Sequence, residues 1–361
     1  MPTSTRRIGI IGAGTSGVYL ARLLIQQGFQ VTLFEKAPYP RTEGCGILLV
    51  QSGMQALNQG DPEICHRIIQ GGVPVQRFEF RNLRGDTISS ESVSYKEHEL
   101  PGMLVHRKVI LEALLDNLPS ERLCGNAELQ SITQTSNSVI AHFKDGSQWE
   151  GDALVGGDGI VSHVRESVVP GVELCYLGDL VWRGIVADNT FCSNGHFIVY
   201  ARGRGIYANF FDIGNGRTHW GFFIEKDQER DEQGKLVPPD SSIPSRELAK
   251  LPSDARAIIE ATPLDQIVTR YSFDIDPLPR LYKGRVVLIG DAAHAKSSTR
   301  ARGMTAGFED ALSLSRHLAS TTEVTEALAA FQAERMPIVH EYQRTSREMS
   351  QKIGRRSKRA A

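Results

Sequence analysis

The chain lacks several features that would place it in a specialised class of protein. Its five cysteines among 361 residues are scattered without a close pair, which fits free thiols in a reducing compartment and neither a disulfide framework nor a zinc site. The formal net charge of −1 gives no general attraction to nucleic acids or anionic membranes. No apolar run is long enough to cross a bilayer, and residues 1–7 contain no signal-peptide core. We therefore expect a cytoplasmic protein with no metal, nucleic-acid or membrane partner.

The residues that are present are typical of a large globular protein. Apolar residues make up 40% of the chain and charged residues 23%, both ordinary values, and the length allows more than one domain. The one run of like charge, at residues 355–359, is interpreted as a solvated terminus.

A strand, a glycine turn and a helix follow one another near the start of the chain. Residues 8–11 form a short apolar run suited to a buried parallel strand. Small and apolar residues then recur at helical spacing from about Ser16 until Gly28, where a residue that tolerates positive φ ends the helix. Residues 31–34 form the next apolar run, so the sequence predicts a complete βαβ start.

The glycines of this turn have the spacing of a dinucleotide fingerprint. Gly12 permits the tight turn, Gly14 lets a diphosphate approach the backbone, and Gly17 lets the helix pack on the sheet. The diphosphate would then lie at the helix N-terminus, where free N–H groups and the helix dipole favour an anion. Glu35 follows about twenty residues later and would accept from a ribose hydroxyl, which disfavours NADP at this site. The expected contacts here are Gly12, Gly14, Ser16, Gly17, Glu35 and Lys36.

Two later segments repeat the pattern of an apolar strand followed by glycine and aspartate. One is Gly157-Asp158-Gly159, with Arg165 beyond it, and the other is Gly290-Asp291, which leads to His294. A carboxylate at the end of a buried strand needs hydrogen-bond partners, and the ribitol of a flavin supplies them for Asp291. Asp291 can also be interpreted as a helix N-cap, and Asp158 as a turn residue before Gly159. Together with the first turn, these segments indicate a tightly held FAD.

The rest of the chain divides into helical and strand-rich parts. Residues 177–272 are rich in aromatic and β-branched residues and predict an antiparallel sheet, interrupted by a polar loop at 226–240. Outside this region we expect helices at 54–69, 109–118, 305–318 and 324–350, and strands at 75–80, 87–95, 153–155 and 285–289. Residues 128–150 are expected to form hairpin strands, with Asp145-Gly146 as a turn.

These motifs, spread over residues 8–317, resemble those of the class A FAD-dependent monooxygenases, the aromatic hydroxylase family typified by p-hydroxybenzoate hydroxylase. The resemblance implies that Arg41 lies near the flavin and Arg107 on its phosphate side. It implies that Asp158 contributes to FAD and NAD(P)H binding, and that Asp291 holds the ribitol. It also implies that the loop after His294 lies along the flavin ring, which adds the cofactor contacts Gly290, Gly303, Met304 and Thr305.

This loop departs from the family pattern at four positions. Ser298 replaces a proline, and Ala301, Arg302 and Thr305 replace a glycine, a glutamine and an asparagine, whereas Gly303 and the segment 309–311 are retained. Loss of the proline frees a φ angle and restores an N–H group. Arg302 is interpreted either as a stabiliser of an anionic flavin or acidic substrate, or as part of a surface salt bridge.

The resemblance implies a monooxygenase in which NAD(P)H reduces FAD and O2 then yields a flavin C4a-hydroperoxide that transfers one oxygen atom to a small, aromatic substrate. The catalytic base is not identified, and the candidates for it are Tyr207, His219 and His294. Arg302 is a further candidate catalytic residue. The altered loop motivates a second hypothesis, a FAD-dependent oxidase, dehydrogenase or reductase on the same fold. A flavin-binding interaction protein without turnover is a third, and a soluble NAD-dependent dehydrogenase leaves the Gly290-Asp291 segment unexplained.

The predicted fold class is α/β, with a Rossmann-like FAD-binding domain around a parallel sheet, interleaved with an antiparallel substrate domain and followed by a C-terminal helix. The FAD-binding domain would take residues 1–73, 99–176 and 273–320, and the substrate domain 74–98 and 177–272. Residues 321–361 would form the C-terminal helix and basic tail. We expect a monomer or a homodimer.

Overall fold

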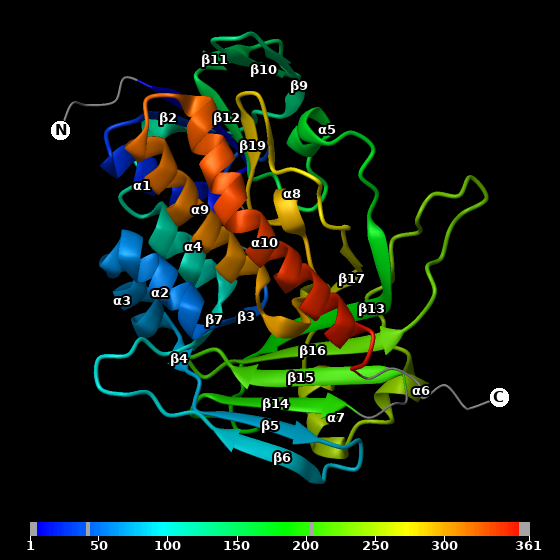
Figure 1. Ribbon diagram of the computed structural model, residues 1–361. Helices are drawn as coiled ribbons and strands as arrows, with labels where there is room; N and C mark the ends of the chain where they lie inside the picture. Colours follow the sequence, from blue (N-terminus) through cyan, green and yellow to red (C-terminus); the bar gives the residue numbers. More distant parts are fainter. Residues whose placement is uncertain (1–5, 41–43, 202–204, 354–361) are drawn as a thin grey trace.

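The computed structural model describes residues 6–40, 44–201 and 205–353. Two main bodies lie end to end in Figure 1, a helix-covered parallel sheet and a broad antiparallel sheet below it. The long helix α10 (Val324–Ser350) runs along the first body and ends beside the second. The predicted fold class, a Rossmann-like α/β domain interleaved with an antiparallel sheet and followed by a C-terminal helix, is confirmed.

The parallel sheet brings the three glycine segments to one edge. Its strands, in the described part of the chain, have the order β18-β19-β12-β1-β2-β8, and only β18 runs antiparallel to its neighbour. The strands β1, β12 and β19, which precede the three glycine segments, are therefore adjacent and parallel. Since parallel strands end at the same edge, the three segments meet there. The strands are β1 (Arg7–Ile11), β2 (Gln30–Phe34), β8 (Leu123–Cys124), β12 (Ala153–Gly156), β18 (Tyr282–Lys283) and β19 (Val286–Leu288).

Helices cover this sheet and bury an apolar core. The helix α1 (Thr15–Gln26) packs closely against α9 (Gly303–Ser320), because Gly307 leaves room for the Ser16 hydroxyl. Leu328 and Phe331 of α10 are fully buried in the same core. The prediction of one helix at 54–69 is wrong, because Pro62 begins a new helix and the Asp61 carboxylate caps it by accepting from the Glu63 N–H. The two helices are α2 (Gln51–Gly60) and α3 (Pro62–Gly71).

The second sheet has the order β17-β13-β16-β15-β14-β5-β6. Its pairs are antiparallel except β14 with β5, which is parallel. The region predicted as sheet also contains two short helices, α6 (Ser245–Leu248) and α7 (Ser253–Glu260). The strands are β5 (Arg77–Arg81), β6 (Thr87–Ser92), β13 (Cys175–Val186), β14 (His196–Ala201), β15 (Ile206–Asp212), β16 (Thr218–Glu225) and β17 (Val268–Asp274).

The alternation of side chains sorts the aromatic residues of this sheet between its two faces. One face is a buried core that includes side chains of α7, and its buried aromatic members are Trp182, Tyr200, Phe210, Trp220, Phe222 and Tyr271. The other face lines a cavity between the two bodies, with Phe197, Tyr207, Phe211 and Phe223. The sheet thus supplies both a core and an aromatic wall.

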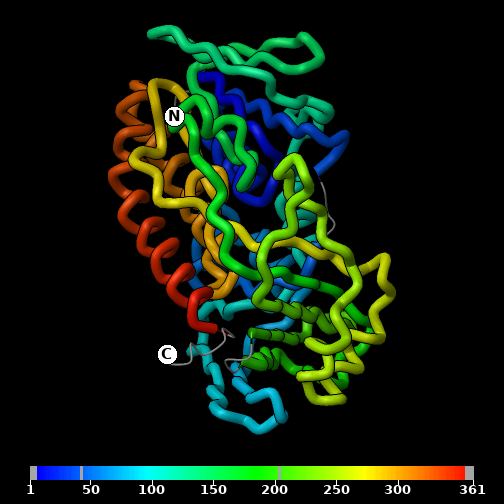
Figure 2. Tube along the Cα trace, turned by 90° about the vertical axis from the view of Figure 1, so that its right-hand side faces the viewer, coloured from blue at the N-terminus to red at the C-terminus, as the bar shows by residue number. Residues whose placement is uncertain are grey.

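The remaining elements connect or extend these bodies. A small sheet of β3 (Gly46–Leu49), β7 (Met103–His106) and β4 (Val73–Pro74) lies between them, and the strands β9 (Leu129–Gln134), β10 (Val139–Phe143) and β11 (Gln148–Gly151) form a projecting sheet. The turned view in Figure 2 shows this sheet at the end of the molecule away from the antiparallel sheet. The other helices are α4 (Arg107–Leu115), α5 (Val164–Val168) and α8 (Asp291–His294), and short 3-10 turns cover Ser120–Arg122, Leu264–Gln266 and Ser298–Arg300. The domain boundaries stay a prediction.

Candidate cofactor and active site

The first two glycine segments are in direct backbone contact. Gly12 has a φ of +102°, and a Cβ atom there would lie 2.5 Å from the Gly157 carbonyl oxygen. A Cβ atom on Gly17 would lie 2.1 Å from the Gly12 carbonyl oxygen, so α1 could not approach the turn. Both positions therefore require glycine for packing.

Gly14 has a different environment. It is the N-cap of α1, and among the described residues no atom beyond its own chain neighbours lies within 4 Å of the position of an added Cβ atom. The N–H groups that begin α1 are thus approachable, as a diphosphate requires. Gly14 borders a cleft of about 310 Å³, which we call the first cleft. Its lining includes Gly12, Gly14, Glu35, Lys36, Arg107, Asp158 and Gly159.

Two carboxylates in the first cleft are held by backbone N–H groups. Glu35 accepts from Ala13 and Ala37, each at 3.0 Å, which fixes it at the end of β2 with lone pairs left for a ribose hydroxyl. Asp158 accepts from the Ser162 hydroxyl at 2.5 Å and from the His163 N–H at 2.7 Å, and it thereby holds the turn into α5. The turn role that was weighed for Asp158 is therefore present, and its carboxylate also borders the cleft.

Arg165 ties the second glycine segment to the third. Its side chain is buried, and the guanidinium donates to the carbonyl oxygens of Ile160 at 2.7 Å and Ala292 at 3.1 Å. Ser16 ties the first segment to the third, because its hydroxyl lies against Gly290 and Gly307 and is turned away from the first cleft. The side chain of Ser16 is therefore a packing contact, and only its backbone is placed to meet a phosphate.

Asp291 lies where a polyol could reach it. Gly290, with a φ of +58°, turns the chain out of β19, and Asp291 begins α8 with an exposed side chain. Among the described residues its carboxylate makes no hydrogen bond, and it lies close to Gly303 at the start of α9, where an added Cβ atom would be 3.9 Å from Oδ1. These oxygens fit the hydroxyl groups of a ribitol chain.

Asp291 borders a larger space that we call the main cavity, of about 460 Å³, between β3, the antiparallel sheet and the loop before α9. Gly303 and Met304 line it as predicted contacts, whereas Thr305 is fully buried with its hydroxyl facing Gly53 of α2. An outer cavity of about 600 Å³ adjoins it. The residues shared by the two cavities are Arg183, Tyr207, Phe223, Lys296, Ser297, Ser298, Thr299 and Ile353.

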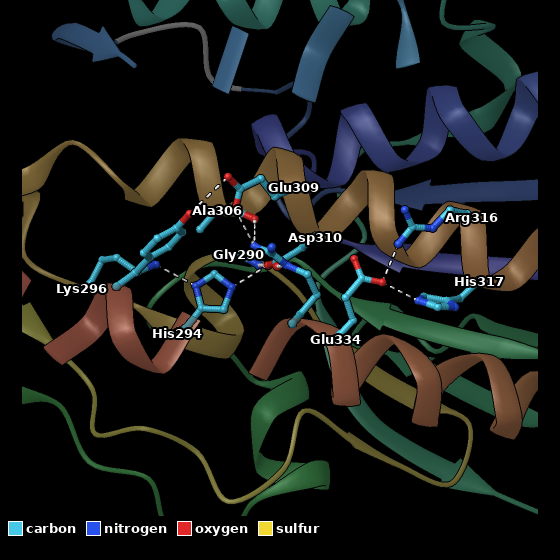
Figure 3. A network of polar contacts seen from close by, with 11 residues as sticks. Gly290, His294, Lys296, Ala306, Glu309, Asp310, Arg316, His317 and Glu334 are labelled. Atoms are coloured by element: carbon cyan, nitrogen blue, oxygen red, sulfur yellow. Dashed lines mark hydrogen bonds and ion pairs between the residues drawn. The ribbon is translucent and has the colours of Figure 1, made fainter. Parts of the chain in front are cut away.

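A buried ionic network supports the third segment from behind (Figure 3). The Asp310 carboxylate accepts from the Gly290 N–H at 2.9 Å, from His294 Nε2 at 2.5 Å and from Arg335 Nε at 2.8 Å. Burial alone would raise the pKa of Asp310, but the charge of Arg335 and the hydrogen bonds from His294 and Gly290 outweigh it and hold that pKa well below its usual range. Arg335 also pairs with Glu309 at 2.8 Å, so the network joins α8, α9 and α10.

The four candidate catalytic residues differ in their access to the main cavity. Tyr207 and His219 line it. His219 Nδ1 accepts from the Gly46 N–H at 3.1 Å, and burial lowers the pKa of His219 to about 3, which keeps its ring neutral. His294 is fully buried behind the cavity. Arg302 is turned away, since it donates to the Ser52 hydroxyl at 2.8 Å and covers the ring of Tyr342.

The altered loop keeps a turn that normally favours glycine. Ala301 has a φ of +52°, in the left-handed region where a Cβ atom is unfavourable. Within the described part of the chain, Arg302 forms no ion pair, and its side chain does not line the main cavity. Arg41, the remaining predicted flavin contact, lies outside the described residues.

Sequence reasoning missed Lys296. Its side chain borders both cavities and its Nζ lies 2.8 Å from His294 Nδ1. The signal in the sequence was the position of this lysine directly after the third segment. The structure shows that its neighbours Ala295 and Ser297 are buried. In the described chain, no group of histidine, cysteine and acidic side chains is arranged to hold a metal ion, and no helix has the length and apolar character to span a membrane.

Comparison with known proteins agrees with this geometry. A family model described as "FAD binding domain" matches residues 5–346. Aurachin C monooxygenase/isomerase from Stigmatella aurantiaca is 29% identical over 92% of this chain and 86% of its own length. A salicylate hydroxylase from Pseudomonas putida is 29% identical over 94% of this chain and 83% of its own length. The structure of Klebsiella pneumoniae HpxO, solved with FAD and uric acid, superposes with a TM-score of 0.87 and 22% sequence identity. The match covers 96% of this chain and 88% of HpxO.

The adjacent glycine segments and the cavities that they border define a flavoprotein of the dinucleotide-binding class. The chain belongs to the FAD binding domain family. The predicted family, the class A FAD-dependent monooxygenases, and the predicted cofactor, FAD, are both confirmed.

Replacement of Gly14 tests where the diphosphate lies. We expect Gly14→Ala to change the stability of the apoprotein by no more than about 1 kcal/mol, because the new methyl group meets no protein atom. Its FAD affinity should fall at least about tenfold, or about 1.4 kcal/mol, because the methyl group would occupy the approach to α1. Absorbance titration of the stripped protein and thermal unfolding measure the two effects. Gly17→Ala is the comparison, since it should destabilise the apoprotein itself; equal FAD affinity of Gly14→Ala and wild type would contradict the assignment.

Removal of one charge tests the network behind Asp291. Asp310→Asn should lower the free energy of unfolding by about 3–5 kcal/mol, because it leaves the buried Arg335 without a full counter-charge. The control is Glu341→Gln, which removes an exposed partner of Arg344 and should leave the free energy of unfolding nearly unchanged, because solvent screens this pair. Urea unfolding gives both values, and similar losses in the two variants would refute the supporting role.

A substitution in the strained turn of the loop should raise the stability of the protein instead of lowering it. Ala301→Gly should stabilise the protein by about 0.5–1 kcal/mol, because glycine adopts a left-handed φ without steric cost. Ala257→Gly, in the middle of α7, should instead destabilise it by roughly 0.5–1 kcal/mol. Thermal unfolding distinguishes the two, and a loss of stability in both variants would mean that the turn at Ala301 is not left-handed in solution.

Proposed function

We propose that the protein is a FAD-dependent monooxygenase that uses NAD(P)H and O2 to insert one oxygen atom into a small aromatic substrate with an acidic oxygen substituent. The observation that carries the proposal is the aromatic-walled main cavity, which begins at Asp291 and Gly303, where the ribitol end of FAD would lead. When bound, FAD supplies the transfer of electrons from NAD(P)H to oxygen, which no protein side chain can perform.

The aromatic wall suits a flat substrate. Phe197 and Phe211 are stacked with ring centroids 4.8 Å apart and an interplanar angle of 11°. Tyr207 and Phe223 pack with centroids 4.4 Å apart. Such rings exclude water from the reacting centre and offer faces and edges to an aromatic ring.

Arg183 supports an anionic substituent on that substrate. Its guanidinium lies 5.8 Å from the centre of the Phe223 ring and borders both cavities. Within the described residues it makes no hydrogen bond or ion pair. An arginine without a protein acceptor is suited to bind a carboxylate or a phenolate oxygen. Relatives named for salicylate, 6-hydroxynicotinate and 3-amino-4-hydroxybenzoate act on aromatic acids of this kind.

The alternative without oxygen insertion rested on the altered loop. The structure gives that alternative no specific support, because Ala301 keeps the left-handed turn and Arg302 points away from the cavity. An interaction protein without turnover would not need a water-excluding cavity next to Asp291.

The experiment is to measure NADH and NADPH oxidation by the purified yellow protein under air, with salicylate, 6-hydroxynicotinate and hydroxybenzoates as substrates. With ¹⁸O2, mass spectrometry should find one ¹⁸O atom in the product. Stimulated oxidation of NAD(P)H with no labelled product from any of these compounds would favour an oxidase or reductase instead.

Arg183 provides a test of the substrate class. Arg183→Gln should raise KM for an aromatic acid by about 10–100-fold, since a lost charged hydrogen bond costs about 1.5–3 kcal/mol. The KM for a neutral phenol should change little. Arg256→Gln in α7 removes an equal charge far from the cavity and should leave both KM values unchanged. Equal effects of Arg183→Gln on the acid and the neutral phenol would contradict an anion-binding role.

A further inference from the structure

Lys296 is placed at the junction of the two cavities. It follows α8 directly, and its side chain is partly exposed between Ala295 and Ser297, which are buried. Because it borders both the main and the outer cavity, a molecule that enters the main cavity from the outer one passes its Nζ.

A chain of hydrogen bonds holds this Nζ in place (Figure 3). The Lys296 Nζ lies 2.8 Å from His294 Nδ1, and His294 Nε2 lies 2.5 Å from Asp310 Oδ2. A lysine ammonium only donates, so Nδ1 must carry a lone pair and Nε2 must carry the hydrogen that Asp310 accepts. His294 is therefore neutral, in agreement with its lowered pKa, which results from burial and the charge of Lys296.

This arrangement accommodates both protonation states of Lys296. A neutral amine can still donate one hydrogen to His294 and then presents its lone pair to the cavity. Burial lowers the pKa of Lys296 to about 8, although Asp291, Asp310 and Glu309 oppose this shift. Arg335 adds to the shift, so both forms are populated near neutral pH.

Three other titratable side chains that face the cavity, those of Tyr207, His219 and Arg183, are less suited to accept a proton. Burial raises the pKa of Tyr207, whose oxygen already accepts from Asn209 at 2.7 Å. The Nδ1 lone pair of His219 is used by Gly46, and a further hydrogen bond joins this ring to the Gly184 backbone. The Arg183 guanidinium stays protonated in proteins.

We propose that Lys296 is the catalytic base of this site: its neutral Nζ takes the proton from a hydroxyl group of the substrate. This inference rests on the proposed function and deepens it. The O–H bond of the substrate breaks and an N–H bond forms, which leaves an anionic oxygen beside an ammonium group. No electrons leave either partner, so the step needs no oxidant. The ionised oxygen makes the ring electron-rich, as oxygen insertion requires, and His294 and Asp310 act as positioning residues.

The first test requires no turnover. The protein with FAD bound is acylated with a trace of acetic anhydride at a series of pH values, and mass spectrometry of peptides gives the extent of modification of each lysine. Lys296 should become reactive with a midpoint near pH 8, about two units below the ordinary value of a lysine ammonium. A midpoint of Lys296 at the ordinary value of a lysine ammonium would overturn the proposal.

The second test uses kinetics. For a phenol that is un-ionised at neutral pH, kcat/KM of the wild type should rise with pH through the same midpoint, because only the neutral amine accepts a proton. Lys296→Met and Lys296→Arg should each lower kcat/KM at pH 7 by about 10²–10⁴-fold. Both variants should lose the wild-type pH midpoint, and Lys283→Met should retain it.

The acidity of the substrate separates a base from a merely structural lysine. With a nitrophenol that is already ionised at the assay pH, the loss in Lys296→Met should shrink to within about tenfold, because no proton remains to be taken. An equal loss for ionised and un-ionised phenols, or an unchanged pH midpoint in Lys296→Arg, would refute the role. Should the wild type insert no oxygen into any phenol, the proposed function fails, and the acylation profile still reports on Lys296.

Discussion

The site depends on one buried carboxylate. Asp310 binds the Gly290 N–H group, His294 and Arg335 at once. The bond from the Gly290 N–H group fixes the turn that presents Asp291. The bond to His294 orients the imidazole ring that holds Lys296. The bond from Arg335 holds α10 against α9. A buried charge is tolerated only when it is paired and hydrogen-bonded, and this one joins the cofactor contact, the amine in the cavity and the C-terminal helix in a single network.

The parallel sheet solves a second problem, the assembly of one site from segments almost 300 residues apart. Because β1, β12 and β19 are neighbours, the turns that follow them meet at one edge. Gly12 touches Gly157, and Arg165 reaches the Ala292 carbonyl. The antiparallel sheet then closes the space beyond Asp291. Its alternation gives one face to the core and the other to the cavity.

The glycine segments, the βαβ start and the aromatic sheet could be predicted from sequence, because each depends on local spacing or composition. The direction in which individual side chains point could not be predicted from the sequence. Ser16 turns toward α9, Arg302 turns to Ser52, and Trp182 and Arg183 take opposite faces of one strand. The break at Pro62 was missed because the apolar spacing continues through it. Lys296 was missed because its environment is set by tertiary packing around Asp310.

The central claim is that the first cleft, Asp291 and the main cavity hold one FAD molecule in an extended conformation. The crystal structure of the FAD complex tests this most directly. The diphosphate should lie at Gly14 and the N-terminus of α1, the ribitol hydroxyls within hydrogen-bond distance of the Asp291 carboxylate, and the ring beside Gly303. A flavin whose ribitol lies away from Asp291, or whose diphosphate lies outside the first cleft, would contradict the account.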